Sequence, residues 1–414
     1  MRGSAVWARR SILAAVLIGA AVIPGRATRV PAARCAAARC SPSESVIRWT
    51  RQLPGSWTAQ GGALGTVLST GQAFAGVGGG VAAVGFGVTV AAYRLSDGAP
   101  LWTASLAGFP VSSAIDSVRA WPGVVTVGVS IPAGPGAVGR EEVVLSGTTG
   151  RRVRAYPAGP YGGAVAASPA ATVIVGTRAV TSYANASGRV IWSRPTGTVA
   201  QAWRVAGDDL FVTVAKGGYL GASPVTALRR IDLTTGAQQL LKPAGGSFAG
   251  TLSSAIGGAV LFSGPAGLSA YSQASGRFLW RRAGLVPQVA DTARQVLYVA
   301  SGRALIGLAP ATGRIRTSSA ALGTGLYAVS RGVAFGLDEG ALGDAWGYDL
   351  FRMRVIWTAK AVPWPHFFAD LSGLGGSAGP AGGPVVLAAC AQLGVTGASG
   401  AAPCQRPELV AIRP

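Results

Sequence analysis

The sequence predicts an all-β protein, because of its composition, its short apolar runs and a strand-turn-strand segment that recurs along the chain. Glycine (62 residues) and proline (25) make up about a fifth of the 414 residues, without a period. This excess argues against collagen and against a helix bundle, and it suits many short strands joined by tight turns. Hydrophobic residues are 49% of the chain, enough to bury a large core, which excludes general disorder.

The recurring segment is an apolar strand, a short polar turn that ends in glycine, and a second strand with tryptophan four residues after that glycine. Its clearest copies are YRLSDGAPLW (93–102), SYANASGRVIW (182–192), AYSQASGRFLW (270–280) and the weaker GYDLFRMRVIW (347–357). Degenerate copies without tryptophan occupy 145–154, 230–240 and 307–317. Glycine supplies the positive φ that such a turn needs.

Another apolar strand precedes most copies, so each unit is expected to be an antiparallel sheet of about four strands. One such sheet cannot bury both faces, and the units must therefore stack face to face. A tryptophan on the outer strand would fill the wedge between neighbouring units. The residues predicted for this docking role are Trp49, Trp102, Trp192, Trp280 and Trp357.

The glycine and tryptophan positions give seven units, and an eighth is split between the two ends of the chain. Residues 45–55 resemble the outer strand of a unit, and residues 407–414 resemble the strand before it. Pairing them would close a ring and remove two exposed sheet edges. The spacing, about 46 residues per unit, is typical of propeller blades. We predict an eight-bladed β-propeller of four-stranded antiparallel blades, with seven blades as the alternative.

These repeats resemble the pyrroloquinoline-quinone-like (PQQ-like) propeller repeat, A-x-[DN]-x-x-[TS]-G-x-x-x-W. Ala184, Asn185, Ser187, Gly188 and Trp192 carry the best match. The resemblance spans nearly all of the chain after its leader and implies the fold of the quinoprotein alcohol dehydrogenase-like proteins. It is nearly silent on activity, because that group includes dehydrogenases and an outer-membrane assembly lipoprotein that only binds proteins.

Quinone-dependent oxidation is the alternative that the resemblance raises, with PQQ and calcium as cofactors. In those enzymes adjacent cysteines cover the quinone and a carboxylate set holds calcium. This chain has no adjacent cysteines, and its 15 acidic residues are scattered, whereas calcium needs six to eight oxygen ligands. Hydrolysis is disfavoured as well, because there is one histidine, no G-x-S-x-G elbow, and no assignable pair of carboxylates for a lyase or glycosidase. We therefore expect no catalytic, cofactor-binding or metal-binding residues.

The first 27 residues are predicted to be a signal peptide or signal anchor. Arg2, Arg9 and Arg10 precede an apolar run at 11–23 that Pro24 ends, and this run is shorter than a spanning helix. An uncleaved segment at 5–23 would tether the chain to a membrane. Residues 28–44 are then a flexible leader and 45–414 the propeller, in an extracytoplasmic location.

The cysteines agree with export to an oxidising compartment. Cys390 and Cys404 flank a loop of small residues, and Cys35 and Cys40 lie close together in the leader. Two disulfides are predicted; closing the C-terminal loop would contribute on the order of 3 kcal/mol in the chain-entropy model. A zinc site is the competing interpretation, but the chain has no CxxC spacing.

Net charge is +21, almost entirely from arginine, which favours anionic partners. No basic run or nucleic-acid module is present, so nucleic acid is not expected as a partner. Arginine follows the turn glycine in four units, at Arg151, Arg189, Arg277 and Arg314. Because equivalent positions emerge on one face of a propeller, these four are predicted to form a partial ring that binds anions; simple solubility is the alternative.

Two further surfaces are candidates. Trp364, His366, Phe367 and Phe368 would form an aromatic pocket or a packed connection between blades. Insertions at 131–141, 217–224 and 390–404 point to the face opposite the glycine turns, where a partner could bind. The sequence favours an exported, monomeric, non-enzymatic scaffold that binds a protein or an anionic cell-envelope component, with a degenerate quinoprotein oxidoreductase as the alternative.

Overall fold

The computed structural model describes most of the predicted propeller. The described residues are 47–53, 57–58, 73–110, 113–134, 137–159, 162–196, 202–215, 225–302, 304–319, 326–330, 332–337, 345–359, 385–393 and 403–412. Contacts group the chain into two units, Met1–Arg39 and Cys40–Pro414, and all described residues belong to the second. The predicted signal segment and leader lie outside the described residues. Within these ranges no helix is long and apolar enough to cross a bilayer.

Every regular element of the described residues is a β-strand, and the strands form eight four-stranded antiparallel sheets. Seven sheets are each built from four consecutive strands. The first four of these are β3 (Ala73–Gly78), β4 (Val81–Phe86), β5 (Thr89–Arg94) and β6 (Pro100–Ser105); β7 (Ala114–Trp121), β8 (Val124–Gly134), β9 (Ala137–Ser146) and β10 (Arg152–Ala158); β11 (Gly163–Ala167), β12 (Ala171–Val175), β13 (Ala179–Ala184) and β14 (Val190–Pro195); β15 (Trp203–Ala206), β16 (Asp209–Ala215), β17 (Val225–Asp232) and β18 (Gln238–Leu241).

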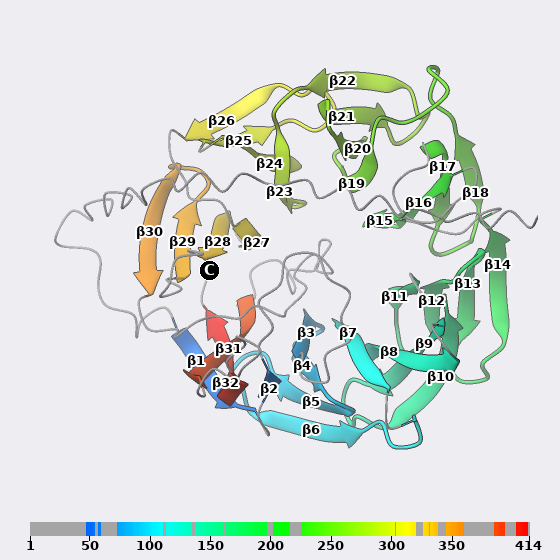
Figure 1. The fold of residues 1–414 in the computed structure, drawn as a ribbon, viewed down its shortest axis with the longest axis vertical. Helices are drawn as coiled ribbons and strands as arrows, with labels where there is room; N and C mark the ends of the chain where they lie inside the picture. The colour runs from blue at the N-terminus through cyan, green and yellow to red at the C-terminus, as the bar shows by residue number, and fades with distance from the viewer. Residues whose placement is uncertain are drawn as a thin grey trace, which may run out of the picture. The chain divides into compact units, whose positions relative to one another are not determined.

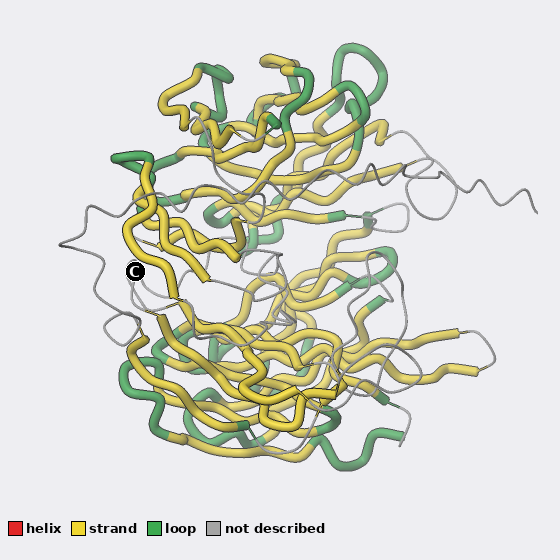
Figure 2. The backbone as a smooth tube through the Cα atoms, turned by 60° about the vertical axis from the view of Figure 1, so that its left-hand side comes forward, coloured by secondary structure: helices red, strands yellow, loops and turns green. Residues whose placement is uncertain are grey.

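Three more sheets of the same kind follow. They are β19 (Thr251–Ile256), β20 (Ala259–Gly264), β21 (Gly267–Ser272) and β22 (Phe278–Arg282); β23 (Val286–Asp291), β24 (Val296–Ser301), β25 (Ala304–Leu308) and β26 (Ile315–Ser319); β27 (Leu326–Ser330), β28 (Val333–Leu337), β29 (Ala345–Asp349) and β30 (Arg354–Ala359). Within Cys40–Pro414 the sheets succeed one another in chain order around a ring (Figure 1), and short loops join the strands (Figure 2).

The remaining sheet contains both ends of the described chain. It consists of β1 (Ile47–Gln52), β2 (Trp57–Thr58), β31 (Val385–Leu393) and β32 (Pro403–Ile412). Strand β1 pairs antiparallel with β32, with Trp49 opposite Ala411 and Thr50 opposite Val410. The predicted pairing of N- and C-terminal strands is therefore confirmed.

The core lies between consecutive sheets. The second and third strands are apolar on both faces, as in β20 with its run Ala-Val-Leu-Phe buried throughout, because each sheet is covered by a neighbour on either side. The outer strands, such as β6 and β14, are largely exposed. Six apolar clusters each join two neighbouring sheets, from β3–β6 with β7–β10 through to β23–β26 with β27–β30. This stacking of sheets is the predicted all-β propeller.

Most of the segment 131–141 is β-strand, whereas the sequence predicts a loop insertion there. Residues 131–134 and 137–141 continue the β8–β9 ladder, with Ile131 opposite Gly139 and Gly134 opposite Ala137. They form a lengthened hairpin because the chain keeps pairing where the other units turn. The insertion at 217–224 lies outside the described residues.

Candidate anion-binding face

The loops between the third and fourth strands share one geometry in six sheets. The turn glycine has φ between 65° and 73° in each of them, at Gly98, Gly150, Gly188, Gly236, Gly276 and Gly313. In five sheets a Ser or Thr hydroxyl accepts the backbone N–H of the residue after the glycine at 3.2–3.4 Å; the acceptors are Thr149, Ser187, Thr235, Ser275 and Thr312. We call the surface made by these loops, together with the loops between first and second strands, the turn face.

Tryptophans of the outer strands lie against the turn of the following sheet. Trp49, Trp102, Trp192 and Trp280 each cover a turn glycine so closely that an added Cβ would overlap the indole; at Gly313 it would lie 2.7 Å from the ring of Trp280. Three of the four indoles also donate to the carbonyl three residues before that glycine, on Leu95 (3.1 Å), Gly147 (2.9 Å) and Pro310 (2.7 Å). The side chain of Trp357 lies outside the described ones.

An arginine two residues after the tryptophan strengthens the same contact in three interfaces. The Nε atoms of Arg51, Arg194 and Arg282 donate to the carbonyls of Gly98, Gly236 and Gly313 at 2.7, 2.5 and 2.9 Å. Sequence reasoning missed this role, although the Trp-x-Arg spacing is visible in all three copies. Part of the arginine excess therefore holds sheets together.

Three interfaces depart from this pattern. Leu240 stands in the tryptophan position of the β15–β18 sheet. Arg154 stands in the tryptophan position and donates from Nε to the carbonyl of Asn185 at 3.4 Å, the same turn position that receives an indole elsewhere. Thr317 stands there in the β23–β26 sheet. The turn it faces has Met353 with φ 51° in place of glycine, which is tolerated because no indole covers that position.

Five arginines at equivalent positions are exposed on the turn face. The predicted set of Arg151, Arg189, Arg277 and Arg314 directly follows a turn glycine, and all four are exposed. Arg354 follows Met353 in the same way and is exposed as well. Sequence reasoning missed Arg354 because methionine replaces the marker glycine, although Trp357 keeps its spacing. Within the described ranges, no hydrogen bond or ion pair joins any of these five guanidinium groups to another residue.

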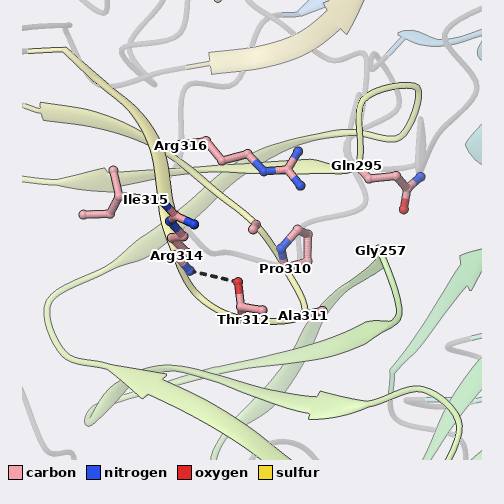
Figure 3. Close-up of a pocket in the computed structure, with 9 residues that line it drawn as sticks. Gly257, Gln295, Pro310, Ala311, Thr312, Arg314, Ile315 and Arg316 are labelled. Atoms are coloured by element: carbon pink, nitrogen blue, oxygen red, sulfur yellow. Dashed lines mark hydrogen bonds between the residues drawn. The ribbon is translucent and has the colours of Figure 1, made fainter.

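Both kinds of turn on this face come together at one pocket of about 590 Å³. It lies between two neighbouring sheets and is lined by Gly257, Gln295 and the turn from Ala309 to Arg316. Arg316 extends towards Gln295 over Pro310, and Ile315 points to the other side of the strand (Figure 3). The lining contains two arginines and no acidic residue.

A buried group of charges lies away from the turn face, between β7–β10 and β11. Arg140 forms an ion pair with Asp116 at 2.7 Å and bonds to the carbonyl of Gly162. Glu142 is completely buried, and no hydrogen bond reaches its carboxylate oxygens in the described part of the chain. Burial raises the pKa of Glu142, although Arg140 and Arg119 act to lower it. Sequence reasoning did not single out this group.

The carboxylates that lie near arginines do not fit a quinone–calcium site. Asp116 and Glu142 lie among guanidinium groups, and Asp291 lies 3.8 Å from Arg294. A calcium ion needs oxygen ligands where these arginines stand. Among the described residues, no three His, Cys, Asp or Glu side chains gather as metal ligands would.

Several predicted sites fall outside the described residues. Trp364, His366, Phe367, Phe368, Cys35 and Cys40 are among them. The backbone of Cys390 lies in β31 opposite Pro407, and that of Cys404 lies in β32 opposite Leu393. The two strands thus extend into the predicted loop at both of its ends, and the two cysteines are not directly opposite each other. Both disulfides remain predictions.

The stacked sheets and their tryptophan-covered turns define the class of protein as a β-propeller. No family model and no curated protein matches the sequence. Among solved structures the chain is similar to quinohemoprotein alcohol dehydrogenase ADHIIG from Pseudomonas putida (11% identity, TM-score 0.51), covering 91% of this chain and 78% of that one. It is also similar to Sqt1 from Saccharomyces cerevisiae (11%, TM-score 0.52, 83% and 97%) and to the dihydro-heme d1 dehydrogenase NirN (12%, TM-score 0.51, 70% and 67%).

Such low identities show the fold alone. They confirm the predicted β-propeller fold. Two of these similar proteins are dehydrogenases, but a shared fold does not decide whether this chain is an enzyme.

Proposed function

We propose that this protein is an exported, non-enzymatic propeller whose turn face binds an anionic component of the cell envelope. The observation that carries the proposal is the set of five exposed arginines at equivalent turn positions, Arg151, Arg189, Arg277, Arg314 and Arg354. Among the described residues, their guanidinium groups make none of the contacts that occupy the arginines between sheets. Exposed guanidinium groups of this kind are suited to bidentate binding of phosphate or carboxylate.

Electrostatics supports the same site. The chain carries a net charge of +21, so anionic surfaces attract it over a long range. The five arginines come from two groups of adjacent sheets, β7–β14 and β19–β30, which places neighbouring positive charges on the same face. Positive charge near an anionic lipid surface contributes about 1 kcal/mol per arginine.

A non-enzymatic role is supported by the chemistry of three carboxylates. Asp116, Glu142 and Asp291 lie close to arginines, so their charge is directed to protein cations rather than to a cofactor or substrate. The alternative, a quinoprotein oxidoreductase, predicts a change in quinone absorbance when PQQ and calcium are added to the protein. We expect no such change.

Sedimentation with vesicles tests the binding site. Vesicles containing phosphatidylglycerol should bind the protein, and changing all five arginines to glutamine should weaken binding at least a hundredfold, since about five kcal/mol of attraction is removed less screening. The salt dependence should fall with it. Folding of the variant is checked by circular dichroism.

A matched pair of single variants locates the site on one face. Arg189 and Arg178 are both exposed residues of the β11–β14 sheet, but Arg178 lies in the loop between its second and third strands, at the opposite end. Arg189→Gln should weaken vesicle binding about fivefold, while Arg178→Gln leaves it nearly unchanged. Equal effects of the two single variants, or unchanged vesicle binding by the variant with all five arginines replaced, would reject the proposal in favour of a simple solubility role.

A further inference from the structure

The turn-face pocket between the β19–β22 and β23–β26 sheets has fixed walls. The indole of Trp280 donates to the carbonyl of Pro310 at 2.7 Å, and Arg282 donates to Gly313 at 2.9 Å. The amide of Gly313 bonds to the carbonyl of Ala309 at 2.8 Å. The turn that lines the pocket is therefore held in place by the preceding sheet, which keeps the ordering cost of ligand binding low.

Close approach of the two sheets also depends on Gly257. A Cβ at this position would lie 3.1 Å from the ring of Pro310 and 3.3 Å from the amide oxygen of Gln295. Glycine thus leaves the hollow open between the first turn of one sheet and the two turns of the next. The volume, about 590 Å³, suits a small molecule.

The lining combines three kinds of chemistry. Arg314 and Arg316 supply positive charge, and the only contact between Arg316 and a neighbour that the described residues show is a long one, 3.4 Å, to the carbonyl of Arg294. Gln295 donates its amide N–H to the carbonyl of Thr292, which leaves its amide oxygen as an acceptor for a ligand hydroxyl. Ala309, Pro310 and Ala311 supply an apolar wall.

We propose that this pocket binds the phosphate group of a small polyol or sugar phosphate. Arg314 and Arg316 bind the phosphate oxygens, Gln295 accepts a hydroxyl of the polyol, and the Ala-Pro-Ala turn contacts its carbon skeleton. The inference rests on the proposed function and deepens it, since it names the chemical group that one part of the turn face recognises. The same group occurs in soluble polyol phosphates, in phosphate-linked envelope polymers and in the headgroup of phosphatidylglycerol.

Calorimetric titration of the full chain with glycerol phosphate tests the proposal. We expect binding about tenfold tighter than that of inorganic phosphate, because the polyol contacts add to the charge. Arg316→Gln should weaken glycerol phosphate binding about tenfold. Arg189→Gln removes the same charge from a different sheet of the turn face and should leave it unchanged. Absence of binding, equal affinity for inorganic phosphate, or equal effects of the two variants would overturn the proposal.

Vesicle binding by the same variants identifies the source of the phosphate. If Arg316→Gln weakens binding to phosphatidylglycerol vesicles more than Arg189→Gln does, the pocket accepts the lipid headgroup; if the two are alike, it takes the soluble or polymer-borne group. Failure of the pocket is distinguishable from failure of the proposed function. If only the pocket proposal fails, Arg316→Gln leaves glycerol phosphate binding unchanged, while the variant with all five arginines replaced still loses vesicle binding. If the proposed function fails, vesicle binding survives in the variant with all five arginines replaced.

Discussion

Glycine at the turn has two separate duties in this propeller. Its positive φ forms the turn, and its missing side chain admits the indole of the preceding sheet. Gly313 has both duties, with φ 65° and the ring of Trp280 directly above it. Gly284 has only the first, with φ 68° and no atom within 4 Å of an added Cβ.

These two glycines allow the duties to be measured apart. Gly284→Ala should destabilise the fold by about 1–2 kcal/mol, the cost of a left-handed conformation with a side chain. Gly313→Ala should cost about 2 kcal/mol more, because the indole must also move. Urea unfolding measures both, and equal losses would show that the indole contact is not tight.

Glu142 is the second residue whose surroundings make a measurable difference. Burial raises its pKa above the ordinary value of 4.5, against the pull of Arg140 and Arg119; Asp116 acts in the same direction as burial. The folded state then holds the proton more tightly than the unfolded state. Stability from this group is complete below the unfolded pKa and is lost as pH rises through the folded pKa.

When the pH is raised above about 4.5, the Glu142→Gln variant should therefore lose less stability than the parent protein does. The change leaves shape and burial nearly intact. Glu141→Gln, one residue earlier and only partly buried, serves as the control and should leave the pH profile close to that of the parent. A stability profile of the Glu142→Gln variant that runs parallel to that of the parent protein would contradict the assigned burial.

At the scale of elements, arginines divide into those that join sheets and those that face solvent. Arg194 and Arg189 belong to the same sheet and differ in this respect: Arg194 donates to the carbonyl of Gly236 in the next sheet, whereas the Arg189 guanidinium is exposed. Substituting each of these two arginines in turn should therefore separate the contribution to stability from the contribution to binding.

Arg194→Gln should lower the free energy of unfolding by about 1–2 kcal/mol, since a charged hydrogen bond is lost, without weakening vesicle binding beyond about twofold. Arg189→Gln should change stability by less than about 0.5 kcal/mol while weakening binding. Urea unfolding and vesicle sedimentation on the same samples measure both. A variant pair with the two effects interchanged would show that the turn-face assignment is wrong.

The sequence is sufficient to predict the repeating elements because the turn glycine and the tryptophan mark each unit. It is not sufficient to separate the arginines, because Arg194 and Arg189 differ only in what the next sheet brings near them. Arg354 escapes prediction since its neighbour Met353 is not glycine. Glu142 also escapes prediction, because it is buried only since strand β9 is covered on both faces. The apolar and polar residues of β9 alternate no more clearly than those of an exposed strand would.

At the scale of the whole molecule, the sheet made from both chain ends couples the termini to the fold. Strand β32 lies between β31 and β1, so removing β1 exposes an edge of β32. Edge strands lose the protection that pairing on both sides gives.

Hydrogen exchange measures this coupling. Deleting residues 1–53 should speed amide exchange in residues 408–412, which pair with β1, at least tenfold. Deleting residues 1–39, which removes only the preceding unit, should leave that exchange unchanged. Protection of 408–412 that survives the longer deletion would contradict closure of the sheet by β1.

The central claim is that the solvent-facing arginines of the turn face, rather than those between sheets, bind the anionic partner. Nuclear magnetic resonance of arginine Nε–H groups during titration with phosphatidylglycerol vesicles tests it most directly. We expect the signals of Arg151, Arg189, Arg277, Arg314 and Arg354 to shift, with those of Arg194 and Arg282 unmoved. Shifts confined to Arg194 and Arg282, or no shift of any arginine signal, would contradict it.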